Sequence, residues 1–422
     1  MSVLQLQSLL GLVLLPLAAY ALRERDRPLA PKTALRLALG GLGLQLAIAG
    51  LLLLIPPARA AVASIAGVVD TLQQATAEGT RLVFGYLGGG PAPFDPVAPQ
   101  NGFILAFQAL PLILFISALT ALLYHWGILQ RIVRAFAFAL SRTLGVSGPL
   151  ATSAAANVFV GMVEAPVLIR PYLRTLDRGG LFAVMSVGLA TIAGTVLVLY
   201  ASLMGATLPD AAGHLVIASV ISAPAALMLA GLMVPTGETQ ALPQPQSEDT
   251  AAGPIDAIVA GTRAGVELLL GVVATLLVFV ALVALVNALL AAIAGPFGLT
   301  LTLEGIAGAL FAPLIWLIGV PWEEAAAGGA LMGLKTVTNE FVAFLRLGAD
   351  ETLSERSRLI MAYALAGFAN FGSVGIMIGG LTAMVPERRT EIVGLGLKSL
   401  VAGTLATLMT GAVIGLLTPP AA

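Results

Sequence analysis

Cysteine is absent from the 422-residue chain, and charged side chains make up only 10% of it. Without cysteine the chain has no disulfide, no thiolate metal site and no cysteine nucleophile. Its two histidines, His125 and His214, lie far apart in the sequence, which argues against a histidine-based metal cluster. A net charge of -1 gives no electrostatic basis for binding nucleic acid. Soluble domains carry about 25% charged residues, so this chain has too few to cover a water-facing surface of its size.

The residues that are present are mostly apolar: 58% are hydrophobic, and the mean hydropathy is +0.98. A helix needs about 20 apolar residues to cross a bilayer. Stretches of that length predict eight spans, at 3–22, 33–56, 102–124, 180–204, 211–234, 265–294, 356–384 and 390–417. More polar stretches at 59–90 and 127–145 predict interfacial helices. The predicted fold class is therefore an all-α polytopic membrane protein.

Basic residues set the predicted orientation of the chain. The first apolar stretch has no basic segment before it, but Arg23, Arg25 and Arg27 follow it. This pattern is typical of a spanning helix that ends in the cytoplasm, and not of a signal peptide. Counting spans from that loop predicts that both termini face the periplasm of a bacterial inner membrane.

Two further apolar segments are predicted to be re-entrant helical hairpins. Residues 147–169 are of membrane length but have basic residues on both flanks, which requires an even number of crossings. Residues 322–346 are the counterpart, with acidic flanks. Each hairpin precedes two predicted spans, and the two are entered from opposite faces. This is the pattern of an inverted repeat, which places a substrate site near the bilayer midplane.

Each predicted hairpin carries a glutamate at membrane depth. An ionisable residue there costs about 2.5–3.5 kcal/mol on insertion scales, so it is a functional candidate by default. Glu164 lies between Gly161 and Pro166; the structural alternatives are helix capping or an ion pair with Lys335. For Glu340 the alternative is again Lys335, but a five-residue spacing on one helix is poor for a direct pair. We expect the two carboxylates to face one polar pocket.

The span after each hairpin has a polar interruption. Thr191 and Thr195 lie in LATIAGTVLV, and Asn370 and Ser373 lie in GFANFGSVGI. Such residues often bond to their own helix, but unwound carbonyls at these points also suit Na+ and polar substrates. The chain has no phosphate-cradling GxxxxGK[ST] motif. Nothing supplies a metal or nucleophile beside the carboxylates, so we expect a carrier, driven by an ion gradient or by the substrate's own gradient, and not an enzyme.

In the segments around these polar residues, the sequence closely resembles the concentrative nucleoside transporters. The likeness is carried by NVFVGMVEAPVLIRPYL, LFAVMSVGLATIAGTVL, GVPWEEAAAGGALMGLKTVTNEFVAF and LSERSRLIMAYALAGFANFGSVGIMIGGLTAMVPERR. It extends to the first and third predicted spans and so covers nearly the whole chain. The resemblance implies an elevator-type homotrimer that moves nucleosides or similar compounds, with Na+ as the coupling ion and no other cofactor.

The resemblance also implies a domain division and roles for single residues. Scaffold segments would cover 1–126 and 258–321, and transport segments 127–234 and 322–422, with a cytoplasmic linker at 235–257. The positions that match substrate-binding residues are Met162, Val163, Glu164, Val196, Glu340, Phe368, Asn370 and Ser373. The positions that match sodium ligands are Asn157, Val160, Thr191 and Ile192.

One departure from the family pattern concerns the base-binding motif. Family members commonly have Gly-Gln-Thr-Glu or Gly-Gln-Ser-Glu where this chain has Gly161-Met162-Val163-Glu164. Met and Val offer no strong hydrogen bond to a base edge, and an unpaired polar group costs about 1–3 kcal/mol. The hypothesis is an altered base preference; the alternative is that waters or neighbouring residues replace the lost bonds. Proton coupling through Glu164 or Glu340 and a non-transporting, substrate-binding membrane protein remain open as well.

Overall fold

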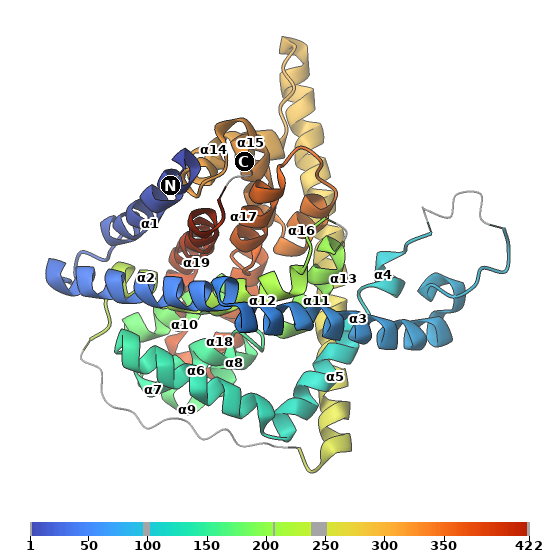
Figure 1. The fold of residues 1–422 in the computed structure, drawn as a ribbon, viewed down its shortest axis with the longest axis horizontal. Helices are drawn as coiled ribbons and strands as arrows, with labels where there is room; N and C mark the ends of the chain where they lie inside the picture. Colours follow the sequence, from blue (N-terminus) through green and yellow to red (C-terminus); the bar gives the residue numbers. More distant parts are fainter. Residues whose placement is uncertain (1, 96–101, 206, 238–250, 420–422) are drawn as a thin grey trace.

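The protein is all helical in the residues that its computed structural model describes, which are 2–95, 102–205, 207–237 and 251–419 (Figure 1). The predicted linker lies largely outside these ranges. The first half contains α1 (Val3–Ala21), α2 (Pro31–Leu54), α3 (Pro56–Phe84), α4 (Leu105–Gln108), α5 (Leu112–His125), α6 (Ile128–Leu144), α7 (Gly148–Ala156), α8 (Glu164–Val167), α9 (Arg170–Leu173), α10 (Arg178–Ala190), α11 (Gly194–Met204) and α12 (Ala211–Met233). The second half contains α13 (Pro254–Ala294), α14 (Leu303–Leu317), α15 (Trp322–Val337), α16 (Glu340–Gly348), α17 (Glu355–Leu365), α18 (Phe371–Met384) and α19 (Arg389–Leu417).

Continuous membrane-length helices are fewer than the eight predicted spans. Within the described ranges, 7 helices are long and apolar enough to cross a bilayer. The predicted span 356–384 is instead divided into α17 and α18 by non-helical residues 366–370. The bent pair α14 and α15, whose axes differ by 119°, would make an eighth crossing if it were counted as one span. The interruption lies slightly before the predicted unwound stretch: Asn370 ends the break and caps α18, whereas Gly372 and Ser373 belong to the first turn of that helix.

The buried centre of the molecule consists of α10, α11, α12 and α19. In their most apolar windows, 89% of the α10–α11 residues, 83% of the α12 residues and 78% of the α19 residues are buried. The corresponding share in α13 is only 6%. Alanine and glycine allow the central helices to approach closely, as is usual in membrane bundles. The apolar sides of α13 must be covered by lipid or by another chain, because water does not solvate such a surface.

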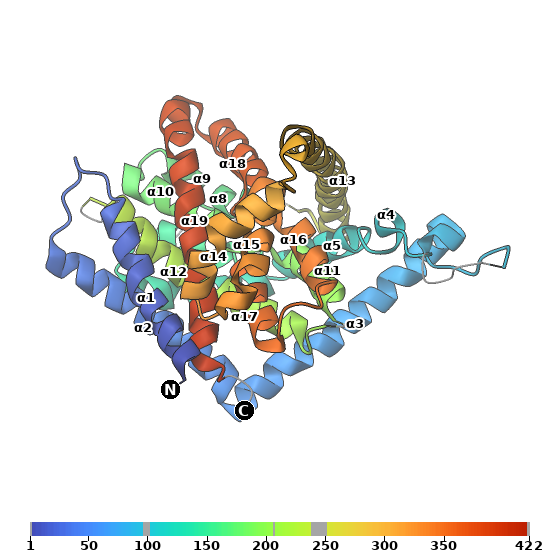
Figure 2. The ribbon, with the colours of Figure 1, turned by 90° about the horizontal axis from the view of Figure 1, so that it is seen from above.

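Helices α1 and α2 pack on this centre, whereas α5 and α13 form a separate pair at its side (Figures 1 and 2). Helix α1 contacts α19 and α12, and α2 contacts α12. The α1–α2 loop is also bound to the end of α12, since the Glu24 amide donates to the Met233 carbonyl at 2.8 Å. Helix α3 links the two groups by contacting both α12 and α5.

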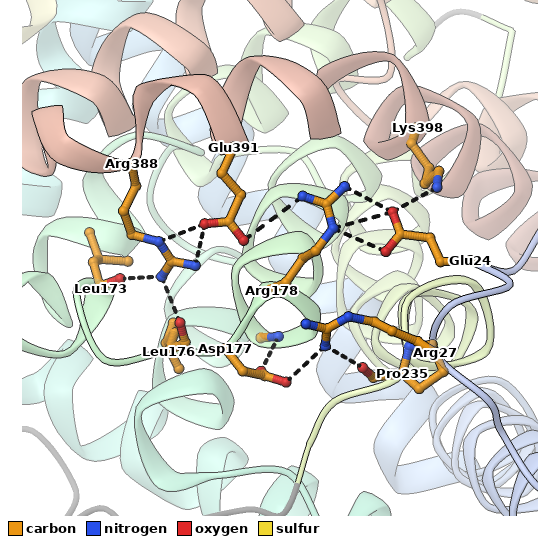
Figure 3. A network of polar contacts seen from close by, with 11 residues as sticks. Glu24, Arg27, Leu173, Leu176, Asp177, Arg178, Pro235, Arg388, Glu391 and Lys398 are labelled. Atoms are coloured by element: carbon orange, nitrogen blue, oxygen red, sulfur yellow. Dashed lines mark hydrogen bonds and ion pairs between the residues drawn. The ribbon is translucent and has the colours of Figure 1, made fainter.

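The two predicted hairpins open at opposite ends of α19. At its start, the Arg388 guanidinium donates to the carbonyls of Leu173 and Leu176, at 2.7 and 2.6 Å, where the first hairpin ends (Figure 3). At its other end, Arg356 donates to the Gly415 carbonyl at 2.6 Å, beside the second hairpin. A helix of 29 residues is about 44 Å long at 1.5 Å per residue. The chain just after the first predicted hairpin and the chain beside the second therefore lie at opposite ends of α19.

The second hairpin leaves on the side from which it enters. Glu324 lies in the first turn of α15 and Ser354 caps the start of α17, and the Ser354 hydroxyl donates to the Glu324 carboxylate at 3.0 Å. The two ends of the chain also lie on one side of the molecule, because the Gln5 side chain donates to the Leu416 carbonyl at 2.9 Å (Figure 2). Both observations agree with an even number of complete crossings.

Candidate functional site

The two helix breaks meet inside the bundle. Helix α10 ends at Ala190 and α11 begins at Gly194, so Thr191 and its two successors are not helical. In the second break, the Phe368 amide donates to the Thr191 carbonyl at 3.3 Å. Segments 177 residues apart in the chain therefore cross at one point. Non-helical backbone at this depth is tolerated only where protein or a water-filled cavity surrounds it, which makes the crossing a candidate site.

Glu340 is fixed at this crossing by two side chains from other elements. Its carboxylate accepts a hydrogen bond from the Tyr200 hydroxyl at 2.7 Å and one from the Asn370 amide nitrogen at 2.8 Å. Only 5% of Glu340 and 1% of Asn370 are exposed. The Asn370 side-chain oxygen accepts from the Ser373 amide at 2.7 Å and so caps the start of α18. Two predicted substrate residues, Glu340 and Asn370, thus form one rigid polar group.

Lys335 is not the partner of Glu340. Its buried ammonium donates to the Ala364 carbonyl at 3.0 Å and to the Thr407 hydroxyl at 3.1 Å. In the described part of the chain it forms no ion pair within 4.0 Å with either Glu340 or Glu164. The direct pair considered from the sequence is therefore wrong, and Lys335 instead ties α15 to the end of α17 and to α19.

Tyr200 is a site residue that the sequence analysis missed. It lies in α11, its ring stacks on Phe344 at 4.9 Å between centroids, and its hydroxyl reaches Glu340. The sequence did contain a signal for it: a tyrosine lies within an apolar span. A buried tyrosine hydroxyl usually has a polar partner, which points to a polar group nearby. Phe279 of α13 was missed too. A β-carbon on Gly372 would lie 3.3 Å from the Phe279 ring, so α13 packs against the first turn of α18.

The remaining residues predicted to line the substrate pocket lie along the same breaks. Ser373 is 7% exposed and belongs to the first turn of α18. Val196 is buried in the first turn of α11, and Phe368 is partly exposed within the second break. The structure brings these positions to the crossing, but no hydrogen bond of the Ser373 hydroxyl occurs in the described ranges.

The tip of the first hairpin packs by its apolar residues. A β-carbon on Gly188 of α10 would lie 3.2 Å from the Met162 β-carbon, and one on Gly380 of α18 would lie 2.6 Å from a Val163 methyl group. Met162 and Val163 therefore hold the hairpin tip between α10 and α18. The contacts that these two side chains make with Gly188 and Gly380 are apolar.

Glu164 differs from Glu340 in its surroundings. Its carboxylate folds back over Gly161, which leaves no room for a β-carbon there. The side chain is exposed and has no hydrogen bond or ion pair to any residue that the structure describes. The pocket expected to join Glu164 and Glu340 stays a prediction, since no contact connects the two carboxylates.

The residues predicted to bind sodium are brought together at the first break. Asn157 follows α7, and its amide nitrogen donates to the Thr191 hydroxyl at 2.9 Å; the Thr191 hydroxyl is 3.3 Å from the Asn157 carbonyl. Both residues are buried. The Ile192 carbonyl accepts from Ser219 at 3.1 Å, and Val160 lies in the turn that follows α7.

One buried oxygen in this group has no partner. The side-chain oxygen of Asn157 is buried and accepts no hydrogen bond, although buried polar atoms are normally paired. Neutral oxygens from amide, hydroxyl and carbonyl groups are ligands for hard cations. No cluster of His, Cys, Asp and Glu suited to a metal ion occurs in the described ranges. The donor set therefore fits Na+ better than a transition metal.

The architecture and the site define a class. A polytopic helical bundle and two broken helices that meet at buried polar groups are features of a secondary transporter. Residues 10–87 and 214–415 match the models described as the N-terminus and the C-terminus of the Na+ dependent nucleoside transporters. Residues 106–207 match a model described as nucleoside recognition. The chain belongs to the Na+-dependent, or concentrative, nucleoside transporter family.

Relatives along the full chain agree with this assignment. The "Nucleoside permease NupC" of Helicobacter pylori is 36% identical over 97% of both chains. An "Uncharacterized transporter" of Haemophilus influenzae is 40% identical, again over 97% of both chains. Human "Solute carrier family 28 member 3" is 33% identical over 90% of this chain and 55% of its own length.

The fold is similar to a transporter that has been solved in several states. The structure of CNTnw in an inward-facing, substrate-bound state superimposes with a TM-score of 0.88 at 37% identity, covering 98% of this chain and 97% of CNTnw. CNTnw structures in outward-facing and intermediate states match similarly, with TM-scores of 0.88 for one of each. The predicted family and helical transporter fold are thus confirmed.

Proposed function

We propose that this protein imports nucleosides, or closely similar ribosylated compounds, into a bacterial cell together with Na+. The observation that carries the proposal is the buried Glu340–Asn370–Tyr200 group at the point where the two broken helices cross. A fixed carboxylate next to an amide is suited to accept and donate hydrogen bonds at neighbouring hydroxyl groups of a sugar. The family assignment and the names of the relatives support nucleosides as the substrate.

In this proposal each side of the crossing binds one part of the substrate. Glu340, Asn370 and Ser373 bind the ribose. The first hairpin and α11 line the base, with contacts from Met162, Val163, Glu164, Val196 and Phe368. The Glu340 carboxylate is already oriented before the substrate binds. It therefore loses little side-chain entropy on binding the ribose, which favours affinity.

Na+ binds at the first break and prepares the site for the nucleoside. Asn157, Val160, Thr191 and Ile192 supply the oxygens, and the unpartnered Asn157 oxygen is the support for this assignment. An ion at Thr191 would also act on the second break, since the Thr191 carbonyl accepts from Phe368 there. This contact offers a physical route by which Na+ and nucleoside binding are coupled.

We further propose an elevator movement within a homotrimer. Helices α5 and α13, together with α3, form the scaffold, while both hairpins and the central helices carry the substrate. Only 6% of the residues in the most apolar window of α13 are buried within the protomer, which supports a subunit interface on this helix. The sequence assigned all of 1–126 to the scaffold; the packing of α1 and α2 on α12 and α19 instead favours their movement with the carrier.

The proposed location is the bacterial inner membrane, with both termini in the periplasm. The basic loop between α1 and α2 lies at the same end of the molecule as Arg178 and Arg388 (Figure 3). Basic residues gathered at one end favour the cytoplasmic side for that end. The termini then lie at the opposite, periplasmic end.

The base preference is proposed to differ from that of relatives with a polar hairpin tip. Met162 and Val163 contact apolar or small residues of α10 and α18, so they give the base no strong hydrogen bond. Uptake of uridine and adenosine would be compared between the wild type and Met162→Gln with Val163→Thr. We expect the double variant to shift the ratio of the two uptake rates; an unchanged ratio in a folded variant would contradict a role in base selection.

Transport itself is tested in proteoliposomes with radiolabelled uridine and an imposed Na+ gradient. We expect accumulation above equilibrium for the wild type and a loss of at least tenfold for Glu340→Gln, since one hydrogen bond to a charged group is worth about 1.5–3 kcal/mol. Glu323→Gln, an exposed carboxylate at the start of α15, is the matched control. Binding without accumulation would mean a substrate-binding protein, and accumulation driven only by a pH step would mean proton coupling.

A further inference from the structure

A cavity of about 320 Å³ lies at the elbow between α2 and α3, and none of the candidate substrate or ion residues lines it. Its walls come from the end of α2, the start of α3, the start of α12, the middle of α17 and the end of α19. It therefore stands at the joint between α3 and the central helices, apart from the crossing of the broken helices.

The cavity has apolar walls and one polar side. Leu52, Val62 and Ile414 are among the apolar wall residues. The polar groups are Arg59, Asp210, His214 and Tyr363. His214 and Tyr363 are already paired, with 2.9 Å between the His214 Nδ1 and the Tyr363 hydroxyl. The two formal charges in the cavity thus come from Arg59 and Asp210.

Both charged residues are exposed. In the described ranges, the Arg59 guanidinium and the Asp210 carboxylate have no hydrogen bond or ion pair. Asp210 precedes α12, where an aspartate normally caps the helix. Here, however, its φ is 55° and its side chain makes no cap bond. The carboxylate is therefore free to contact a ligand, as is the guanidinium.

The depth of the cavity indicates what the ligand is. Three membrane-length helices end around it: α2 ends at Leu54, α12 begins at Ala211, and α19 ends at Leu417. The ends of spanning helices lie at the level of the lipid headgroups. A guanidinium suits a phosphate, a free carboxylate suits an ammonium group, and the apolar walls suit acyl chains.

We propose that this cavity binds a phospholipid with a zwitterionic, primary-amine headgroup, of the phosphatidylethanolamine type. Arg59 binds its phosphate, Asp210 binds its ammonium group, and the acyl chains lie along Leu52, Val62 and Ile414. A lipid in this position joins the α2–α3 elbow to α12 and α19. The site is independent of the transport site and of the proposed function.

Lipid binding is measured on the full-length protein, delipidated in detergent, by native mass spectrometry and by thermal unfolding. Phosphatidylethanolamine, phosphatidylglycerol and phosphatidylcholine with identical acyl chains are the probes. For the wild type we expect phosphatidylethanolamine to be retained best and to raise Tm most. Arg59→Gln should reduce its retention at least fivefold, and Asp210→Asn should remove the preference over phosphatidylglycerol. Arg36→Gln, an exposed arginine at the other end of α2, is the control and should keep the preference.

A cavity-filling variant separates lipid binding from folding. Ala63 lines the cavity, so Ala63→Leu occupies the space while leaving both charges in place. We expect its lipid-free Tm to match the wild type and its Tm gain with phosphatidylethanolamine to be lost. Equal retention of the three lipids by the wild type, or an unchanged preference in Arg59→Gln and Ala63→Leu, would overturn the proposal. A Tm gain of the same size with soluble phosphoethanolamine would also contradict it, because the acyl chains would then have no part.

Discussion

Glu340 shows how one side chain of the site depends on three separate elements. Its backbone begins α16, its carboxylate is held by Tyr200 of α11 and Asn370 of the second break, and both oxygens are engaged. A carboxylate oxygen has more than one lone pair, so it can accept from these partners and still accept from a substrate hydroxyl. The orientation of this one group is therefore set by elements from both halves of the chain.

Tyr200→Phe tests this arrangement. The variant keeps the ring that stacks on Phe344 and removes only the hydroxyl that donates to Glu340. We expect nucleoside affinity to fall by roughly tenfold or more, because a hydrogen bond to a charged group contributes about 1.5–3 kcal/mol. Isothermal titration or uptake KM measures the change. Ser202→Ala on the same helix, whose hydroxyl donates only to the Leu199 carbonyl, should leave affinity unchanged.

The Thr191 hydroxyl gives a second test at the scale of single residues. Thr191→Val keeps the shape of the side chain but removes the hydroxyl that contacts Asn157. We expect the Na+ concentration for half-maximal uptake to rise about tenfold, which corresponds to about 1.4 kcal/mol. Ser202→Ala, whose hydroxyl donates only to its own helix, is again the control. Equal Na+ dependence in Thr191→Val and the wild type would remove the hydroxyl from the ion site.

At the scale of elements, charged side chains connect the α1–α2 loop to α10 and α19 (Figure 3). The Arg178 guanidinium donates to the two Glu24 oxygens, at 2.9 and 3.0 Å, and the Lys398 ammonium donates at 2.9 Å. The hydrogen bond from Arg178 lowers the pKa of Glu24 to about 2; burial opposes this shift, and Lys398 adds to it. The loop is thereby bound to two helices of the central bundle.

This network predicts a pH dependence of stability. The folded-state pKa of Glu24 is lower than its ordinary value of 4.5. Its contribution, about 3 kcal/mol, is therefore fully present above about pH 4.5 and is lost as the pH falls towards 2. Thermal unfolding of Glu24→Gln and the wild type should differ most near pH 6 and converge at low pH. Asp26→Asn, an exposed change in the same loop, should show no such convergence. A Tm difference that is constant with pH would contradict the network.

At the scale of the whole molecule, packing divides the helices differently from their order in the chain. Helices α1 and α2 lie on α19 and α12, whereas α5 and α13 lie on each other (Figure 2). An elevator movement must slide the carrier past the scaffold, so the helices that contact the central bundle most extensively are expected to move with it. The α1–α2 loop, held by Arg178 and Lys398, strengthens this expectation.

Spin labels measure this movement directly, since the chain has no native cysteine to react. We expect the distance between labels at Leu39→Cys of α2 and Leu397→Cys of α19 to stay constant when Na+ and nucleoside are added. The distance between Leu277→Cys of α13 and Leu397→Cys should change. All three side chains are exposed, at 61%, 65% and 69% for Leu39, Leu397 and Leu277. Labelled protomers would be diluted with unlabelled ones to remove distances between subunits. A change in the first distance as large as in the second would place α2 in the scaffold.

The sequence alone determined the membrane class, most of the spans and the approximate positions of both helix breaks. The reason is that a bilayer requires long apolar helices, and it makes each polar or helix-breaking residue inside them conspicuous. The intramembrane polar residues Glu340 and Asn370 were found in the same way, and the family motifs assigned roles to them and to Asn157; the structure brings all three to the two breaks. These signals are local, so one chain is enough to find them.

Only the tertiary structure decided which distant residues meet. Glu340 accepts a hydrogen bond from Tyr200, and Lys335 donates to the Ala364 carbonyl and the Thr407 hydroxyl. Glu164 remains exposed. The tertiary structure also placed α1 and α2 on the central bundle. Helical periodicity states which face of a helix is apolar, but it does not state which other helix covers that face. In a chain whose helices are nearly uniformly apolar, close packing and a few buried hydrogen bonds make that choice.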